Sequence, residues 1–177
     1  MPVAVPSLVP RSDFPLLAEV SYLNQASLGL VPASAIDRIR AYHDAHLGCG
    51  NHNLSDEAEA AILDDVRTTA ARLLGVQPLD VAITAGATEV IGQIAWATRP
   101  AASTNIVCIG DDFPSVTYPW LRVAEVTGAE VRLAIAGVQP NENTVDNIAL
   151  MVDGSTAVIC VSHVLYHTGE RLDLDRL

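Results

Sequence analysis

A run of small residues after a short apolar strand is the part of this sequence best suited to bind a phosphate. It reads Ile83-Thr84-Ala85-Gly86-Ala87-Thr88-Glu89, and a helix is expected to begin near its end. The start of a helix offers unpaired N–H groups and the positive end of the helix dipole, and small residues let an anion come close. The pattern therefore predicts a phosphate cradle in the loop 85–88. A tight connection in which Thr88 only caps the helix is the alternative.

Two side chains that follow later strands suit an aromatic ligand. Phe113 offers a flat ring for stacking, and the imidazole of His163 can form a hydrogen bond with a ring oxygen. Both follow the carboxyl ends of predicted strands, where parallel sheets bind their ligands. A phosphate cradle, a stacking ring and a polar contact together indicate a small phosphorylated aromatic cofactor. An ordinary core position is the alternative for Phe113.

Other ligands match the sequence less well. The small-residue turn is neither a G-x-G-x-x-G sequence nor a Walker A sequence, which argues against a dinucleotide or a nucleoside triphosphate. His43, His46 and His52 lie close together in the sequence, but no carboxylate or cysteine completes a familiar pattern, so no metal site is predicted. Asp153 precedes its strand and is expected at the end of the sheet opposite the cofactor.

The elements that must position these residues alternate between strand and helix from residue 81 onward. Strands are predicted at 81–84, 106–109, 131–135 and 156–162, separated by helices near 88–98, 116–127 and 143–151. This alternation predicts an α/β fold with a mostly parallel sheet, right-handed crossovers and helices on both faces. The loops expected at the carboxyl ends of the strands are 85–88, 110–115, 136–143 and 163–169.

The first eighty residues have a different pattern. Prolines break residues 1–20, which are interpreted as an N-terminal arm, and a short strand is predicted at 21–24. A helix is expected from about Pro32 to the glycines after Leu47. A second helix is expected to be capped by Ser55, to end at Gly75 and to carry an apolar stripe. The stripe consists of Ile62, Val66, Ala70 and Leu73.

The composition limits the partners and the compartment. The 177 residues are 50% apolar and 18% charged, and their net charge is −11, with the acidic residues scattered. This charge argues against binding to nucleic acid or to an anionic membrane, and no apolar run is long enough to span a bilayer. Cys49, Cys108 and Cys160 are expected to be reduced thiols, so a cytoplasmic protein is predicted. All ten basic residues are Arg, and the sequence contains no Lys.

Four motifs resemble, in order and spacing, the class V aminotransferase-like enzymes. These are fold type I pyridoxal phosphate enzymes that include cysteine desulfurases, selenocysteine lyases and isopenicillin N epimerase-like proteins. The resemblance covers nearly the whole chain from Tyr22. The motifs are Tyr22-Leu23-Asn24-Gln25-Ala26-Ser27, Thr84-Ala85-Gly86-Ala87-Thr88-Glu89, Asp112-Phe113-Pro114-Ser115 with Tyr118-Pro119-Trp120, and Val161-Ser162-His163-Val164 with Thr168-Gly169.

The resemblance implies a role for each matching residue. The turn of Gly86, Ala87 and Thr88 corresponds to the cradle of the cofactor phosphate. Phe113 stands where desulfurases usually place a stacked His, which favours the epimerase-like branch. His163 matches the position near the phenolic oxygen of the cofactor. Asn24 and Ser27 match a segment near the substrate, although both residues also suit a simple turn.

The resemblance also indicates what this sequence lacks. Similar enzymes continue to an Asp that pairs with the pyridine nitrogen, to the Schiff-base Lys and to a small domain with a substrate-binding Arg. Residues 21–177 are therefore expected to be the N-terminal half of a large domain whose sheet is incomplete without a partner chain. The resemblance implies a cofactor-holding subunit of a split enzyme that acts on an amino acid or amine. Its partner would supply the Lys and the Asp, and a higher oligomer of the heterodimer is expected.

The chemical outcome is left open by the sequence. Transamination, racemisation, desulfuration and elimination all remain possible, because the residues that select among them are not in this chain. A non-catalytic relic, an interaction protein or a piece of a longer enzyme is the alternative to a split enzyme.

Overall fold

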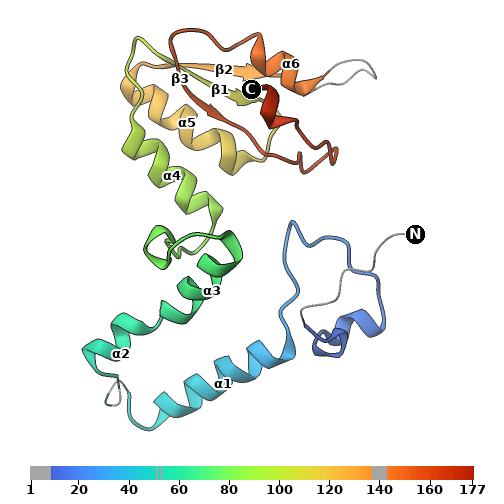
Figure 1. Ribbon diagram of the computed structural model, residues 1–177, viewed down its shortest axis with the longest axis vertical. Coiled ribbons are helices and arrows are strands. Elements are labelled where there is room, and N and C mark those ends of the chain that lie inside the picture. Colours follow the sequence, from blue (N-terminus) through green and yellow to red (C-terminus); the bar gives the residue numbers. More distant parts are fainter. Residues whose placement is uncertain (1–8, 51, 53, 137–142) are drawn as a thin grey trace. The chain divides into compact units, whose positions relative to one another are not determined.

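The computed structural model describes residues 9–50, 52, 54–136 and 143–177 (Figure 1). The chain divides into two compact units, Met1–Val81 and Ala82–Leu177, called here the N-terminal and C-terminal units.

The C-terminal unit contains a parallel three-stranded sheet with β1 in the centre. The strands are β1 (Asn105–Ile109), β2 (Glu130–Ala134) and β3 (Thr156–Cys160), and their order is β2-β1-β3. They alternate with α4 (Ala87–Thr98), α5 (Pro114–Thr127) and α6 (Thr144–Ala149). The prediction of an α/β fold with a parallel sheet is confirmed.

Side chains of β1 alternate between two hydrophobic cores. Ile106 and Cys108 pack with a first core that includes Trp120 and Val123 of α5. Val107 and Ile109 pack with a second core that includes Ile148 of α6 and the later residues Leu165 and Leu172. All five residues of β1 are buried, as expected for a central strand covered on both faces.

The helices of the N-terminal unit begin and end largely where their capping residues predict. They are α1 (Ala33–Leu47), α2 (Asp56–Ala61) and α3 (Asp64–Leu74), preceded by the 3-10 turns η1 (Arg11–Asp13) and η2 (Pro15–Ala18) and followed by η3 (Pro78–Asp80). The Ser55 hydroxyl accepts a hydrogen bond from the Ala58 N–H at 3.2 Å. Gly75 ends α3 in the left-handed conformation, with φ of 71°.

Two features of the predicted secondary structure are wrong. The single helix expected from Ser55 to Gly75 is interrupted at Ile62 and Leu63, where the backbone turns and α3 begins anew at two acidic residues that suit a helix N-terminus. The segments 21–24 and 81–84 are not strands. A strand needs a neighbour for its backbone groups, and neither segment has one among the described residues. The first eight residues of the predicted arm lie outside the described residues.

The N-terminal unit has almost no hydrophobic core of its own. Ala71 is the one buried apolar residue among its described residues. The predicted apolar stripe is largely exposed, with Val66 at 51% and Leu73 at 83%. A surface of this kind is typical of a segment that packs against other protein.

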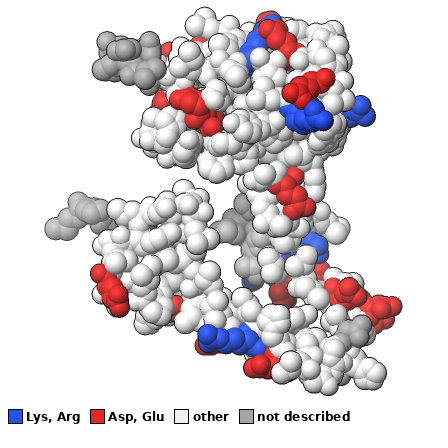
Figure 2. Space-filling view, turned by 180° about the vertical axis from the view of Figure 1, so that it is seen from behind, with Lys and Arg blue, Asp and Glu red and all other residues white. Residues whose placement is uncertain are grey.

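The distribution of acidic side chains and the state of the cysteines agree with the expectations from the sequence. Acidic side chains are scattered over the face shown in Figure 2 and do not form one patch. The three cysteines form no disulfide, and burial raises the pKa of the Cys108 thiol to about 12. No helix in the described part of the chain is long and apolar enough to cross a bilayer.

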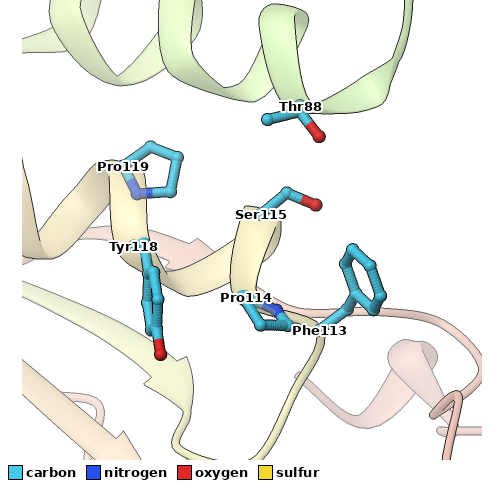
Figure 3. A pocket seen from close by; sticks show the side chains of 6 residues that line it. All are labelled: Thr88, Phe113, Pro114, Ser115, Tyr118 and Pro119. Atoms are coloured by element: carbon cyan, nitrogen blue, oxygen red, sulfur yellow. The ribbon is translucent and has the colours of Figure 1, made fainter.

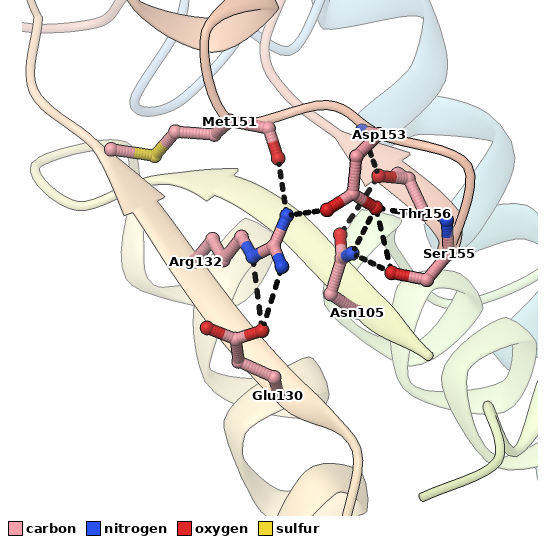
Figure 4. Close-up of polar contacts among 7 residues, drawn as sticks. All are labelled: Asn105, Glu130, Arg132, Met151, Asp153, Ser155 and Thr156. Atoms are coloured by element: carbon pink, nitrogen blue, oxygen red, sulfur yellow. Dashed lines mark hydrogen bonds and ion pairs between the residues drawn. The ribbon is translucent and has the colours of Figure 1, made fainter. Parts of the chain in front are cut away.

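A polar cluster fixes the amino ends of the three strands (Figure 4). The Asp153 carboxylate accepts hydrogen bonds from the Ser155 hydroxyl at 2.6 Å, from Arg132 at 2.7 Å and from the Asn105 amide at 3.0 Å. Arg132 also donates to Glu130 at 3.0 Å. Asp153 thus lies at the end of the sheet opposite the predicted cofactor loops, as its sequence position predicts.

We expect Asp153→Asn to lower the melting temperature at neutral pH. The bonds from Ser155 and Arg132 hold the pKa of the Asp153 carboxyl well below its ordinary value, so its stabilisation is present above about pH 4 and is lost as the pH falls. The difference between wild type and variant should narrow below that pH when melting is followed by circular dichroism. Asp146→Asn, which breaks one exposed ion pair with Arg176, is the control and should have little effect. Equal melting of the two variants would contradict a special role for Asp153.

Candidate functional site

The predicted phosphate cradle lies at the start of α4, with Gly86 as the N-cap residue. No described residue accepts a hydrogen bond from the N–H groups of Gly86, Ala87 or Thr88. A Cβ placed on Gly86 would meet no atom within 4 Å, and its φ of 169° is extended backbone that any residue adopts. The site therefore has open space and unused donors together.

The side chain of Glu89 shapes this turn but accepts no hydrogen bond from the N–H groups of Gly86, Ala87 or Thr88. One of its oxygens accepts from the Ala85 N–H at 3.0 Å, and the other accepts from the Gln93 amide at 2.9 Å. The carboxylate is thus held on the side of Ala85 and Gln93. The three N–H groups of the cradle remain available to a ligand.

A cavity of about 490 Å³ joins the start of α4 to the start of α5 (Figure 3). The hydroxyl groups of Thr88 and Ser115 point toward the side of the cavity where the Phe113 ring lies. The positive ends of two helix dipoles meet there, which favours an anion. The lining residues are Thr88, Phe113, Pro114, Ser115, Tyr118 and Pro119.

Phe113 is an exposed ring at this cavity and not a core residue. Half of its surface is exposed, so the alternative of an ordinary core position is wrong. Its ring meets that of Tyr166 edge to face, with 5.4 Å between the ring centres. Tyr166 holds one side of Phe113, and the ring also lines the cavity that contains Thr88.

His163 lies beyond β3, as predicted, but lines a different cavity. It is exposed, and it borders a space of about 600 Å³ with the segment 171–175. The structure thus brings Thr88, next to Gly86 and Ala87 at the start of α4, and Phe113 to one cavity, and His163 to another. A contact between His163 and a cofactor stays a prediction.

Asn24 and Ser27 belong to the N-terminal unit. The Asn24 carbonyl accepts hydrogen bonds from the N–H groups of Ser27 at 3.2 Å and of Leu28 at 3.3 Å, so these residues form a turn. Their predicted contact with a substrate stays a prediction.

The sequence interpretation gave no role to three residues at the site, Ser115, Tyr118 and Tyr166, although the first two lie in a motif that carries the resemblance. Ser115 and Tyr118 are three residues apart on α5 and therefore share a helix face, which was a usable signal. Tyr166 follows β3, and no local pattern connects it with Phe113. The predicted loop at 136–143 lies mostly outside the described residues. Within the described part, no group of three or more His, Cys, Asp or Glu side chains is arranged to hold a metal ion.

Comparison with known proteins identifies the family. A model of the family described as aminotransferase class-V matches residues 21–177, so the chain belongs to that family. The chain is 31% identical over 150 residues to isopenicillin N epimerase of Streptomyces clavuligerus. The match covers 83% of this chain and 37% of that protein. It is 27% identical to a probable cysteine desulfurase of Treponema pallidum, over 90% of this chain and 41% of that protein.

Solved structures share the fold. A C-DES mutant with glycine covalently linked to the PLP cofactor matches 95% of this chain and 44% of its own, with a TM-score of 0.82 and 23% identity. The Escherichia coli cysteine desulfurase CsdA matches 94% of this chain and 43% of its own, with a TM-score of 0.73 and 25% identity. The chain thus corresponds to the N-terminal part of fold type I enzymes and spans about two fifths of the curated relatives' length.

We expect Gly86→Val to weaken binding of pyridoxal phosphate at least about tenfold while leaving the melting temperature nearly unchanged. The extended backbone at Gly86 accepts a side chain without strain, but the side chain would enter the space beside the free N–H groups. Fluorescence titration and thermal melting measure the two effects. Gly92→Ala, a change inside α4 that also meets open space, is the control and should retain binding. Unchanged binding in Gly86→Val would exclude this turn as the cradle.

Proposed function

We propose that this chain holds pyridoxal 5'-phosphate and acts as the cofactor-holding subunit of a split enzyme. The observation that carries the proposal is the cavity that joins Thr88 at the start of α4, where three N–H groups have no acceptor among the described residues, to the Phe113 ring at the start of α5. Membership of the aminotransferase class V family supports the choice of cofactor, as does the PLP cofactor named for the C-DES structure.

The donor set fits a phosphate group. The N–H groups of Gly86, Ala87 and Thr88 and the hydroxyls of Thr88 and Ser115 are hydrogen-bond donors, and phosphate oxygens are acceptors. Two helix N-termini add positive potential, so the cradle needs no cationic side chain. The cavity volume lies within the range of small-molecule sites.

The residues of this chain would bind and orient the cofactor. The cradle would hold the phosphate, and Phe113, held edge to face by Tyr166, would lie against the pyridine ring and keep water from that side. Bound pyridoxal phosphate supplies an electron sink for reactions of amino acids and amines. We assign Asn24 and Ser27 to substrate binding, as the family resemblance implies.

A second polypeptide would complete the enzyme. The sequence contains no Lys, so the Schiff-base Lys must come from outside it, together with the Asp that pairs with the pyridine nitrogen. β3 has one sheet neighbour, β1, and its other edge has no partner strand among the described residues. Apolar side chains exposed in both units, such as Leu73 and Ile159, would gain cover from the partner. We expect the heterodimers to assemble further.

Thr88→Val should weaken binding of pyridoxal phosphate about tenfold, because it keeps the shape of the side chain and removes a hydroxyl that donates to a charged phosphate. Thr88→Ser is the matched control and should bind nearly as well as wild type. Absorbance titration with pyridoxal phosphate measures both. The cradle would be refuted by a valine variant that binds like the serine variant.

The split arrangement is tested by producing the chain alone and with the neighbouring reading frame. A yellow complex that co-purifies, and that loses its colour when the partner's Lys is replaced by Ala, supports the split enzyme. The competing proposal is a relic, an interaction protein or a piece of a longer enzyme. It is favoured if neither the chain alone nor the chain with any co-produced partner acquires cofactor.

A further inference from the structure

Asp112 is a buried carboxylate whose hydrogen bonds join the loop after β1 to the loop after β3. It lies just beyond β1 and is 5% exposed. Its Oδ1 accepts from the Phe113 N–H at 2.7 Å and from the Ser162 hydroxyl at 2.7 Å, and its Oδ2 accepts from the Ser162 N–H at 2.8 Å. Both oxygens are therefore used to bind the two loops.

These bonds join segments that are 50 residues apart in the sequence. They are neighbours because Cys108 of β1 and Cys160 of β3 are paired in register, so the chain leaves the sheet at adjacent points. One donor belongs to Phe113, and the other two belong to the residue before His163. A single carboxylate thus connects the loop with the stacking ring to the loop that carries His163.

No arginine or histidine of the described residues forms an ion pair with Asp112. Its neighbour Asp111, in contrast, is half exposed and pairs with His167 at 3.2 Å. A buried carboxylate without a cation depends on its hydrogen bonds. All three bonds to other residues end on the two loops, so the loops and the carboxylate hold one another in place.

We propose that Asp112 is a positioning residue that sets the orientation of the Phe113 ring relative to the loop of His163. This inference rests on the proposed cofactor site, because the ring that Phe113 orients is that of pyridoxal phosphate. Asp112 does not contribute to the phosphate cradle. Its loss should therefore disturb the orientation and binding of the cofactor ring and leave the binding of the phosphate group unchanged.

The test compares Asp112→Asn, Ser162→Ala and wild type, with Asp153→Asn as a control that loses stability at the other end of the sheet. In Asp112→Asn an NH2 group replaces one carboxylate oxygen and faces a donor of Ser162 that the oxygen accepted from. The bond between the two loops is then lost, so we expect binding of pyridoxal phosphate to weaken about tenfold. The induced circular dichroism of the cofactor, measured per bound molecule, should fall by about half or more in Asp112→Asn, because this signal reports the orientation of the ring. Ser162→Ala, which removes one bond of three, should show a smaller change in the same direction. Binding of inorganic phosphate should stay within about twofold of wild type.

A second measurement works without the cofactor. Amide hydrogen exchange should become faster in both loops of Asp112→Asn, 110–116 and 161–168, and remain unchanged there in Asp153→Asn. If wild type does not bind pyridoxal phosphate, the proposed function fails, and this measurement still decides whether Asp112 couples the loops. The inference is overturned if exchange rises in neither loop or in only one. It is also overturned if bound cofactor keeps its induced signal in Asp112→Asn.

Discussion

The burial of β1 between two hydrophobic cores is the interaction on which the candidate site depends. Its side chains alternate between a core with α5 and a core with α6, and its backbone pairs on both edges with β2 and β3. A strand held on four sides fixes the points where the neighbouring chain segments leave the sheet. The loop with Phe113 follows β1 directly, so its position is set by the most buried element of the unit.

The edges of the sheet lack the burial and the two-sided pairing that hold β1. β3 pairs on one side only, and the N-terminal unit buries a single apolar residue among those described. Hydrophobic burial is the main favourable term in folding, so surfaces of this kind gain stability when other protein covers them. The family relationship gives a natural source of that cover, because the chain matches about two fifths of its curated relatives. The split-enzyme proposal assigns that cover to a second polypeptide.

Local signals predicted much of the fold and part of the site. Small residues predicted the start of a helix near Thr88, and Ser55 and Gly75 predicted helix ends, because caps act within a few residues. The strand predicted at 81–84 failed because strand formation needs a partner that local sequence does not reveal. The link between Asp112 and Ser162 was beyond prediction for the same reason, since it depends on the register of β1 and β3.

The most direct test of the central claim follows the backbone amides of this chain by NMR while pyridoxal phosphate is added. If the chain holds the cofactor as proposed, the largest shifts occur at the N–H groups of Gly86, Ala87 and Thr88, followed by those of Phe113 and Ser115. Inorganic phosphate should reproduce the shifts of the cradle and not those of Phe113. Shifts confined to other parts of the chain, or no saturable shift at the cradle, would contradict the account.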